Sequence, residues 1–223
     1  METWATAGGA LEASSIKWIL FDLGGVLVDL DFDDAVNRFV AESGAPRGRV
    51  LSLLKQEFSG PPAGYSLTEQ AVIGHLTAEE YVERLCSGLG NAVSPEGVVE
   101  ILNSILRGVN PGTLGLVKRL KETPRRVACM SNTDDLHWRH FRDNLGIAEL
   151  FDVRWYSFEQ RLAKPHVEAF ARASEMLGAL PGEVLFIDDK LVNVQGARAH
   201  GMHAIQFSNP EGLERELRQS GII

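Results

Sequence analysis

Acidic side chains follow two separate apolar runs of this sequence. The run VLFI ends in Asp188 and Asp189, and the run WILF ends in Asp22. Carboxylates placed where strands leave a core lose solvation and need a cation or several hydrogen bonds as compensation. Three such groups that converge at one edge of a core indicate a divalent metal site. Each of them alone is equally compatible with an ordinary helix N-cap or turn residue.

Two further segments carry groups that could bind an anion beside such a metal. The strand-like run 126–130 is followed by Ser131 and Asn132, which places a hydroxyl and an amide at another strand exit. Lys164 precedes Pro165 and a helical stretch, where its ammonium group could contact an anion as a point charge. Each signal is weak alone, because SNT often caps a helix and a lone lysine is usually solvated.

In their order and spacing, the four segments together resemble the motifs of the haloacid dehalogenase (HAD) superfamily. The motifs are WILFDLGGVLVD with Asp22, MSNT with Ser131, AKP with Lys164, and FIDDKLVNVQGARAHGM with Asp188 and Asp189. The resemblance runs from about residue 16 to residue 207. It is strongest to the subfamily that includes bacterial sugar-phosphate phosphatases and the N-terminal phosphatase domain of soluble epoxide hydrolases.

The resemblance implies a magnesium-dependent phosphatase that hydrolyses a small phosphorylated metabolite. Asp22 would attack phosphorus and form an aspartyl-phosphate, which divides a difficult displacement into two easier ones. Mg²⁺ suits an all-oxygen site completed by water. Its ligands would be Asp22, the backbone carbonyl of Gly24, Asp189 and, directly or through water, Asp188.

The same resemblance assigns phosphate binding to the other two motifs. Ser131, the adjacent backbone amides and Lys164 would bind the transferring oxygens, and Lys164 would also offset the crowded carboxylates. Asn132 would orient the nucleophile or the substrate. Ser131, Asn132 and Lys164 therefore complete the expected catalytic set around Asp22.

Position 24 departs from the family pattern. HAD phosphatases generally carry a second Asp two residues after the nucleophile, as general acid and base, but this chain has Gly24 there. General acid–base catalysis is typically worth 10² to 10⁴-fold, or about 3 to 5 kcal/mol of barrier. Another group or a water could replace it, with Asp29, Asp31 and the inserted module as candidate sources. Alternatively, the substrate has a good leaving group, or turnover is weak.

Two other functions remain open at this stage. Haloacid dehalogenases also lack the second Asp and act on carbon without metal, but they carry a Ser-Asn pair where this chain has Asp188 and Asp189. A catalytically weak scaffold that binds phosphate or a partner is favoured by Gly24 alone. The histidines at His137 and His140 do not form a zinc site with other residues at suitable spacing, and a solvated helix face is expected for them.

Strand and helix patterns alternate along most of the chain, which predicts a doubly wound α/β fold with a parallel five-stranded sheet. Ligands bind outside the carboxyl ends of the strands in such sheets, where Asp22, Ser131 and Asp188 fall. The resemblance implies the strand order five-four-one-two-three. The expected strands are 17–21, 126–131, 153–156, 184–188 and 203–207, and the expected helices are 114–121, 135–144, 167–177 and 194–200.

An inserted helical module is predicted between the first two motifs, because far more residues separate Asp22 from Ser131 than Ser131 from Lys164. The expected division is a flexible tail at 1–15, an HAD core at 16–31 and 109–223, and a small helical cap at 32–108. Helices are predicted there at 33–42, 48–57, 77–88 and 95–106, with a hinge at 108–112.

Composition indicates an ordinary enzyme. The chain has 223 residues, of which 44% are hydrophobic, and its net charge is −8. That charge repels nucleic-acid phosphates and anionic lipid, so neither nucleic acid nor membrane is an expected partner. No secretion signal or spanning segment is recognised, and Cys86 and Cys129 are expected to be reduced core residues, so a cytoplasmic location is expected.

Overall fold

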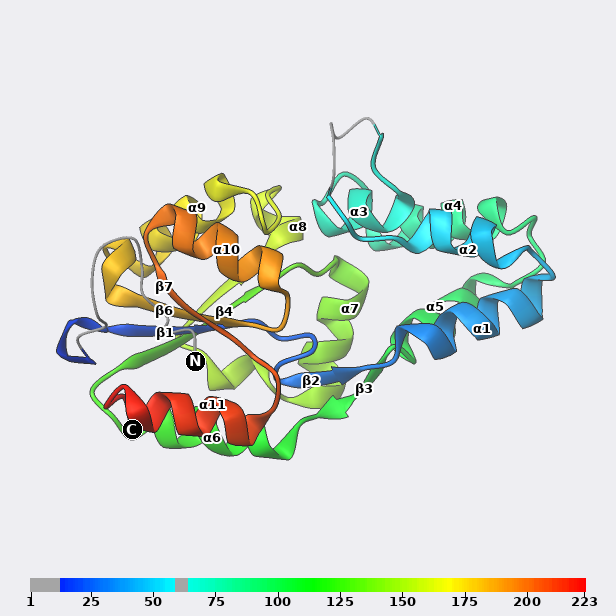
Figure 1. Ribbon diagram of the computed structural model, residues 1–223. Coiled ribbons are helices and arrows are strands. Elements are labelled where there is room, and N and C mark those ends of the chain that lie inside the picture. Colours follow the sequence, from blue (N-terminus) through cyan, green and yellow to red (C-terminus); the bar gives the residue numbers. More distant parts are fainter. Residues whose placement is uncertain (1–12, 59–63) are drawn as a thin grey trace.

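A parallel five-stranded sheet forms the centre of the computed structural model, which describes residues 13–58 and 64–223 (Figure 1). The strand order is β5-β4-β1-β6-β7, and all neighbouring strands are parallel. This confirms the predicted fold class and the strand order implied by the resemblance. The strands are β1 (Trp18–Phe21), β4 (Arg126–Ser131), β5 (Val153–Tyr156), β6 (Val184–Asp188) and β7 (His203–Gln206).

Helices cover both faces of this sheet. Successive side chains of a strand point to opposite faces, so Ile19 and Phe21 pack into one core and Trp18 and Leu20 into another. The first core contains residues of α6 (Pro111–Lys121) and α11 (Pro210–Gln219), and the second contains residues of α9 (Val167–Leu177) and α10 (Leu191–His200). These two helix pairs lie below and above the sheet in Figure 1.

The helices between β2 (Val28–Leu30) and β3 (Leu106–Val109) form a separate group to the right of the sheet in Figure 1. They share their own apolar core, to which Phe39, Tyr81 and Leu85 belong. The antiparallel strands β2 and β3 connect this group to the sheet. We propose that these helices are the predicted cap. They are α1 (Phe32–Ser43), α2 (Arg47–Leu54), α3 (Leu67–Val72), α4 (Ala78–Gly88) and α5 (Pro95–Asn103).

Two predicted cap helices end earlier than expected. The helix predicted at 48–57 ends at Leu54, because the Glu69 carboxylate accepts hydrogen bonds from the backbone amides of Glu57 and Phe58 (2.8 and 2.6 Å). The helix predicted at 95–106 ends at Asn103, and Leu106 instead pairs with β2. The helices predicted at 77–88 and 95–106 begin within one residue of the predicted positions, where the side chains of Thr77 and Ser94 cap α4 and α5.

A further helix, α7 (Asp135–His140), follows the β4 strand and continues into a π-helical turn at Phe141–Leu145. Shorter helical segments of the described chain include α8 (Ser157–Gln160) and 3-10 turns at Ala13–Ser15, Ala148–Leu150 and Pro181–Glu183. Most of the predicted tail at 1–15 lies outside the described residues, which begin at Ala13.

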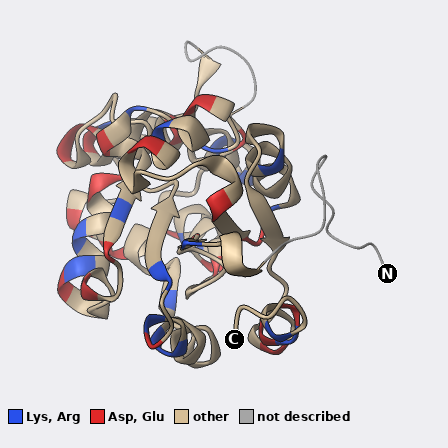
Figure 2. Cartoon of the chain, turned by 90° about the vertical axis from the view of Figure 1, so that its left-hand side faces the viewer, with Lys and Arg blue, Asp and Glu red and all other residues tan. Residues whose placement is uncertain are grey.

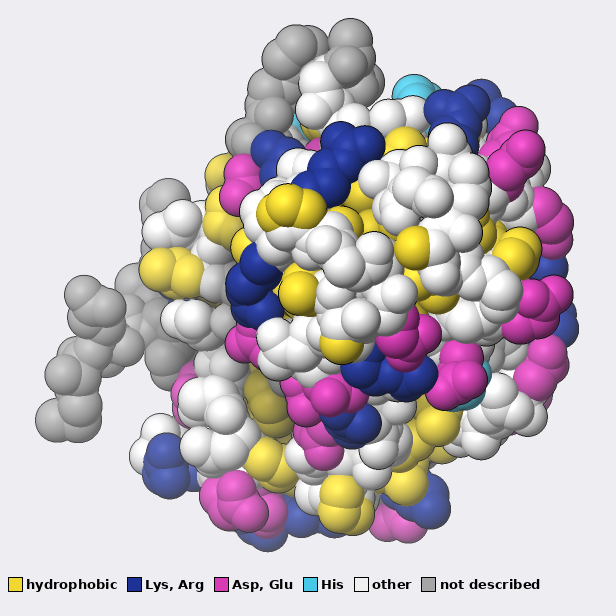
Figure 3. Space-filling model, turned by 90° about the vertical axis from the view of Figure 1, so that its right-hand side faces the viewer, with side chains coloured by type: hydrophobic (Ala, Val, Ile, Leu, Met, Phe, Trp, Pro, Cys, Tyr) yellow, Lys and Arg dark blue, Asp and Glu magenta, His cyan; other side chains and the backbone are white. Residues whose placement is uncertain are grey.

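Charged residues of both signs are interspersed over the helices, while the strands of the sheet are mostly uncharged (Figure 2). On the side of the molecule where the proposed cap lies, acidic, basic and hydrophobic side chains are likewise interspersed (Figure 3). No helix in residues 13–58 and 64–223 has the length and apolar composition needed to cross a membrane. Cys86 and Cys129 are both buried free thiols.

Candidate active site

The three acids predicted to share a metal site lie together at the carboxyl edge of the sheet. Asp22 follows β1 and Asp188 ends β6, and the register of these neighbouring strands places Phe21 beside Ile187. The backbone amide of Asp22 donates to the carbonyl of Ile187 (2.8 Å), which extends the pairing by one residue. One carboxylate oxygen from each of Asp22, Asp188 and Asp189 lies within 4.8 Å of the others.

Lys164 places a single ammonium group among these carboxylates. Its Nζ lies 3.0 Å from Asp22 Oδ1 and 2.6 Å from Asp188 Oδ2, and it donates to the carbonyl of Met130 (3.0 Å). The residue is 1% exposed. Burial alone would lower the pKa of Lys164, but Asp188 and Asp22 raise it above its ordinary value, so the ammonium stays charged.

One ammonium does not balance three carboxylates. Burial, opposed by Lys164 and reinforced by Asp188 and Asp189, raises the pKa of Asp22 to about 7. Burial and the charge of Asp188 also raise the pKa of Asp189, and Asp189 Oδ1 is buried without a hydrogen-bond partner. A divalent cation would supply the missing positive charge and a partner for this oxygen, so the residues present fit Mg²⁺.

The turn after β1 depends on glycine at one of its two glycine positions. Gly25 has a φ of +79°, and a Cβ added there would lie 2.7 Å from Asp189 Oδ2. Position 25 therefore brings the backbone close to the acidic cluster in a conformation that other residues rarely adopt. Gly24 is not among the glycines with positive φ, and a Cβ there would meet only the exposed side chain of Leu30, at 3.0 Å.

Asn132 pairs with the backbone of Lys164 through both ends of its amide. Its Nδ2 donates to the carbonyl of Lys164 (2.8 Å), and its Oδ1 accepts from the amide of Lys164 (2.9 Å). Ser131, the preceding residue, is buried at the end of β4. The structure therefore brings Ser131, Asn132 and Lys164 together and uses the Asn132 side chain to hold the lysine backbone.

Asn193 is a site residue for which the sequence predicted no role. Its Nδ2 lies 3.0 Å from both carboxylate oxygens of Asp188, and the amide of Lys190 donates to Asp188 Oδ1 (2.9 Å). Asn193 lies in the first turn of α10, five residues after Asp188, so a search for amide side chains just beyond the acid pair could have found it. These donors fix the orientation of Asp188.

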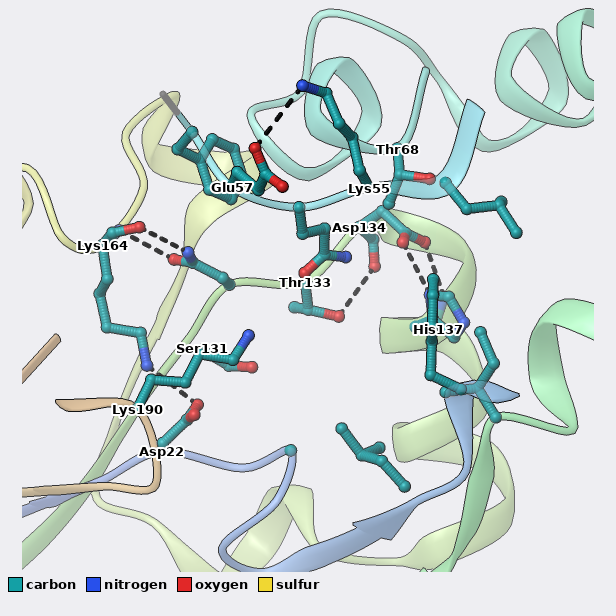
Figure 4. Close-up of a pocket in the computed structure, with 18 of the residues that line it drawn as sticks. Asp22, Lys55, Glu57, Thr68, Ser131, Thr133, Asp134, His137, Lys164 and Lys190 are labelled. Atoms are coloured by element: carbon teal, nitrogen blue, oxygen red, sulfur yellow. Dashed lines mark hydrogen bonds and ion pairs between the residues drawn. The ribbon is translucent and has the colours of Figure 1, made fainter. Parts of the chain in front are cut away.

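A cavity of about 420 Å³ lies between the sheet edge and the cap (Figure 4). Its lining includes Asp22, Gly24, Ser131, Asn132 and Lys164 from the core, and Leu54, Lys55, Thr68, Tyr81 and Leu102 from the cap. Figure 4 shows Asp22, Ser131 and Lys164 on one side of this space and Asp134 and His137 on the other. The predicted nucleophile and phosphate-binding groups therefore open into a space shared with the cap.

Asp29 and Asp31, considered as replacements for the missing acid, are not among the described residues that line this cavity. Asp29 accepts a hydrogen bond from Asn110 Nδ2 (3.1 Å). Asp31 caps α1 through the amide of Asp34 (3.0 Å) and pairs with Arg107 (3.0 Å). Both carboxylates are occupied in the connection between the core and the cap, so neither is placed to protonate a leaving group.

His137 lines the cavity as well, in contrast to the solvated position expected from the sequence. Its Nδ1 lies 2.7 Å from Asp134 Oδ2, and its Nε2 lies 3.1 Å from the carbonyl of Leu102 in α5. Both ring nitrogens face acceptors, so both donate and the ring is an imidazolium. Burial alone would lower the pKa of His137, but Asp134 and the Leu102 carbonyl raise it above its ordinary value.

We expect the His137→Gln substitution to destabilise the fold in a pH-dependent manner. Because the folded-state pKa of His137 is raised, its stabilisation is complete below the unfolded value near pH 6.5 and is lost as the pH rises through the folded-state pKa. Hydrogen bonds to a charged group contribute about 2 kcal/mol, so we expect the free energy of unfolding to fall by about that amount at pH 6. Urea unfolding of both proteins from pH 5.5 to 10 measures the difference.

The matched control is His75→Gln, because His75 is exposed and is not among the described residues that line the cavity. This variant should unfold with nearly the wild-type free energy throughout the range. A loss in His137→Gln that is the same at every pH would contradict the charged bridge.

The comparison with protein families gives the decisive observation. A model of the haloacid dehalogenase-like hydrolases matches residues 16–201 of this chain. The chain belongs to the HAD-like hydrolase family. Its fold, with Asp22 beside the Asp188–Asp189 pair at the carboxyl edge of the sheet, is thereby placed among hydrolases.

Curated relatives of this HAD hydrolase include enzymes of different lengths. It is 24% identical to the D-ribitol-5-phosphate phosphatase of Bacteroides thetaiotaomicron, over 91% of this chain and 97% of the relative. It is 28% identical to the bifunctional epoxide hydrolase 2 of Mus musculus, over 92% of this chain and 39% of the relative. Against the acyl-CoA dehydrogenase family member 10 of Mus musculus, it is 25% identical over 96% of this chain but spans only 20% of the relative.

Solved structures show the same fold. The HAD family enzyme BT-2542 of Bacteroides thetaiotaomicron, in complex with magnesium and inorganic phosphate, has a TM-score of 0.75 and 26% identity, over 86% of this HAD hydrolase and 94% of that chain. The L-2-haloacid dehalogenase of Xanthobacter autotrophicus has a TM-score of 0.60 at 22% identity, over 93% and 84%. The likeness to the dehalogenase is one of fold alone.

Proposed function

We propose that this HAD hydrolase is a Mg²⁺-dependent phosphatase of a small phosphorylated metabolite, with Asp22 as the nucleophile. The observation that carries the proposal is the cluster of three carboxylates around one buried ammonium, with one oxygen of Asp189 left unpaired. Such a cluster suits a hard cation, and phosphoryl transfer from a dianionic ester needs one. The likeness to a phosphatase over nearly its whole length, and to a structure with magnesium and phosphate, supports the proposal.

Asp22 is oriented by contacts to one of its two oxygens. The amide of Leu23 donates to Oδ1 (2.7 Å), and Lys164 Nζ lies 3.0 Å from the same atom. Oδ2 is therefore the oxygen that we propose attacks phosphorus, which forms the aspartyl-phosphate and breaks the ester bond to the leaving group. Water then releases phosphate and restores the carboxylate.

Mg²⁺ would be held by Asp22, the carbonyl of Gly24, Asp188 and Asp189. When bound, the ion would screen the phosphate charge from these carboxylates. Ser131, nearby backbone amides and Lys164 would bind the transferring oxygens. We propose that Asn132 acts on Lys164, whose backbone it holds, and that it thereby sets the position of the ammonium group.

The test is phosphate release from a panel of phosphate monoesters, with and without Mg²⁺, beside halide release from 2-haloacids. We expect phosphate release that requires Mg²⁺. Halide release without metal would instead support the dehalogenase-type hydrolase, which the acid pair at Asp188 and Asp189 disfavours. Phosphate binding without turnover on any ester would support the catalytically weak scaffold.

The Asp189→Ala substitution is expected to weaken Mg²⁺ binding by about tenfold or more, because the metal loses a carboxylate ligand. Activity should fall at low Mg²⁺ and recover in part as Mg²⁺ is raised, since the nucleophile and the phosphate-binding groups stay in place. Calorimetric titration with Mg²⁺ measures the affinity. An unchanged affinity would contradict the assignment of Asp189 as a ligand. Asp152→Ala, remote from the carboxylate cluster, is the control for a general loss of charge.

The Gly24→Asp substitution is expected to raise the turnover of alkyl phosphates by up to about 10²-fold and that of aryl phosphates much less. An alkoxide needs protonation as it leaves, whereas an acidic phenol needs little. The backbone at Gly24 accepts a side chain, and the added Cβ meets only the movable end of Leu30. Steady-state kinetics on both ester classes give the comparison. An equal change for both classes, with normal Mg²⁺ binding, would show that an acid is already supplied from elsewhere.

A further inference from the structure

Apolar and polar side chains both line the cavity, and most of the surface that it exposes is apolar. We infer that the substrate carries an apolar leaving group, an aryl or alkyl phosphate ester in place of a polyhydroxylated sugar or polyol phosphate. This inference deepens the proposed phosphatase function and rests on it for the position of the phosphate. It concerns which ester the cavity prefers, which the family assignment leaves open.

Buried apolar side chains form the inner wall of this cavity. Leu54, Leu102 and Phe141 come from three different helical segments, and each is almost wholly excluded from solvent. Phe58, also buried, lines the cap side. A leaving group that enters between these side chains exchanges water for apolar surface, which is favourable for a hydrocarbon and unfavourable for hydroxyl groups.

The buried polar groups of the inner wall already have partners within the protein. The hydroxyls of Thr68 and Tyr81 lie 2.6 Å apart, and Thr68 also donates to the carbonyl of Leu53 (3.3 Å). Each of the two hydroxyl hydrogens therefore has an acceptor. His137 uses both ring nitrogens, one of them on Asp134. A sugar hydroxyl buried here would find few free partners, and an unpaired buried hydroxyl costs about 1 to 3 kcal/mol.

Exposed apolar side chains lie around the same cavity. Leu30, Phe32 and Val192 all line it, and all three are among the large hydrophobic side chains exposed on the described part of the chain. Such side chains gathered beside one opening indicate a surface that an apolar ligand covers. Charged groups such as Lys55 and Lys190 are exposed at the cavity and keep their contact with water.

An apolar aryl leaving group also agrees with the residue at position 24. This chain has Gly24 in place of the usual acid, and neither Asp29 nor Asp31 is among the described residues that line the cavity. Because an acidic phenol departs with little protonation, the missing acid lowers the rate least for an aryl ester. The cavity lining and the missing acid are separate observations that favour the same class of ester.

The test uses 4-alkylphenyl phosphates from methyl to butyl, because added methylene groups extend the apolar surface while the acidity of the phenol stays nearly constant. We expect kcat/KM to rise by two- to fourfold per methylene, where fourfold corresponds to about 0.8 kcal/mol. The 4-propylphenyl ester should also exceed its polar counterpart of similar size, the 4-(2-hydroxyethyl)phenyl ester, by at least tenfold. A flat series, or equal kcat/KM for this pair, would overturn the inference.

A binding measurement separates this inference from the proposed function. Calorimetry with the corresponding 4-alkylbenzylphosphonates, at saturating Mg²⁺, reports cavity preference without turnover. Affinity that rises with chain length while no ester is hydrolysed would retain the apolar site and refute the phosphatase. Hydrolysis without any rise in affinity or kcat/KM along the series would retain the phosphatase and refute the apolar site.

Two neighbouring residues provide a matched pair of variants. Val192 and Leu191 are 52% and 48% exposed in the first turn of α10, but only Val192 lines the cavity. Val192→Asn should lower kcat/KM for the butyl ester several-fold and leave the methyl ester nearly unchanged. Leu191→Asn should leave the whole series unchanged. Equal effects of both variants would contradict a cavity contact by Val192.

Discussion

Replacement of Asp22 by Asn is expected to lower kcat for phosphate release by about 10⁴-fold or more, because the amide cannot form the covalent intermediate. The substitution keeps the size of the side chain and an oxygen that can accept the hydrogen bond from the amide of Leu23. Binding of Mg²⁺ should weaken only in part, since Asp188 and Asp189 remain. Phosphate release by purified wild type and variant at saturating Mg²⁺ gives the ratio.

The same variant should not be destabilised in the absence of metal. The pKa of Asp22 is raised to about 7, so above that pH the folded protein holds a carboxylate that is more stable in the unfolded chain. The neutral amide removes this penalty, and the metal-free variant should melt at or above the wild-type temperature at pH 8. The difference should shrink as the pH falls toward 4.

Asp29→Asn is the control, since Asp29 is exposed and lies outside the cavity lining. This variant should keep wild-type turnover, and its melting temperature should stay close to that of the wild type from pH 4 to pH 8. Retention of most of the phosphatase activity in Asp22→Asn would contradict the covalent mechanism.

The Lys164→Met substitution is expected to reduce both activity and stability. Its ammonium contacts Asp22, Asp188 and the carbonyl of Met130, so its loss leaves buried carboxylates without their cation. Breaking such a buried arrangement by removing one partner costs about 3 to 5 kcal/mol. Urea unfolding of the metal-free proteins at pH 7.5 measures the loss, and added Mg²⁺ should restore part of the stability but not phosphate release.

A second substitution distinguishes the charge effect from a packing defect. In the double variant Lys164→Met with Asp188→Asn, one of the uncompensated charges is gone, so the double variant should be less destabilised than the sum of the two single variants. Lys17→Met, at an exposed lysine paired with Glu183, should change neither the free energy of unfolding nor phosphate release. Additive losses in the double variant would contradict a direct charge interaction between Lys164 and Asp188.

The sheet could be predicted from sequence because its strands are short apolar runs that end in recognisable residues. The predicted limits of β4, β5 and β6 agree with the structure, and the acids fall at the strand ends as expected. The helix α9 likewise matches its prediction, since its apolar positions repeat at helical spacing. These are features that neighbouring residues determine.

The features that were not predicted depend on contacts between distant residues. The end of α2 follows from a carboxylate on α3, and β2 and β3 form only because they pair with each other. His137 was expected on a solvated face, and its position against Leu102 depends on where α5 lies. The helix α11 carries a local signal, the Asn209 cap before Pro210, which the strand and helix pattern alone did not bring out.

The division into core and cap, and the roles assigned to Asp22, Ser131, Asn132, Lys164 and the acid pair, stay predictions that the variants above test. What the structure adds is their arrangement: these groups come from four segments of the chain outside the helices α1 to α5. The cap contributes the wall opposite them.

The double hydrogen bond between Asn132 and the Lys164 backbone joins the end of β4 to a loop far along the chain. The ammonium also contacts a residue after β1 and one in β6, so hydrogen bonds and ion pairs join four segments of the chain, none of which belongs to the proposed cap. In the proposed function, the groups that carry the chemistry therefore lie outside the helices α1 to α5, whereas the cavity that would receive the leaving group is lined by both parts of the chain. We expect substitutions in the proposed cap helices to change which ester is accepted without moving Asp22, Lys164 or the acid pair.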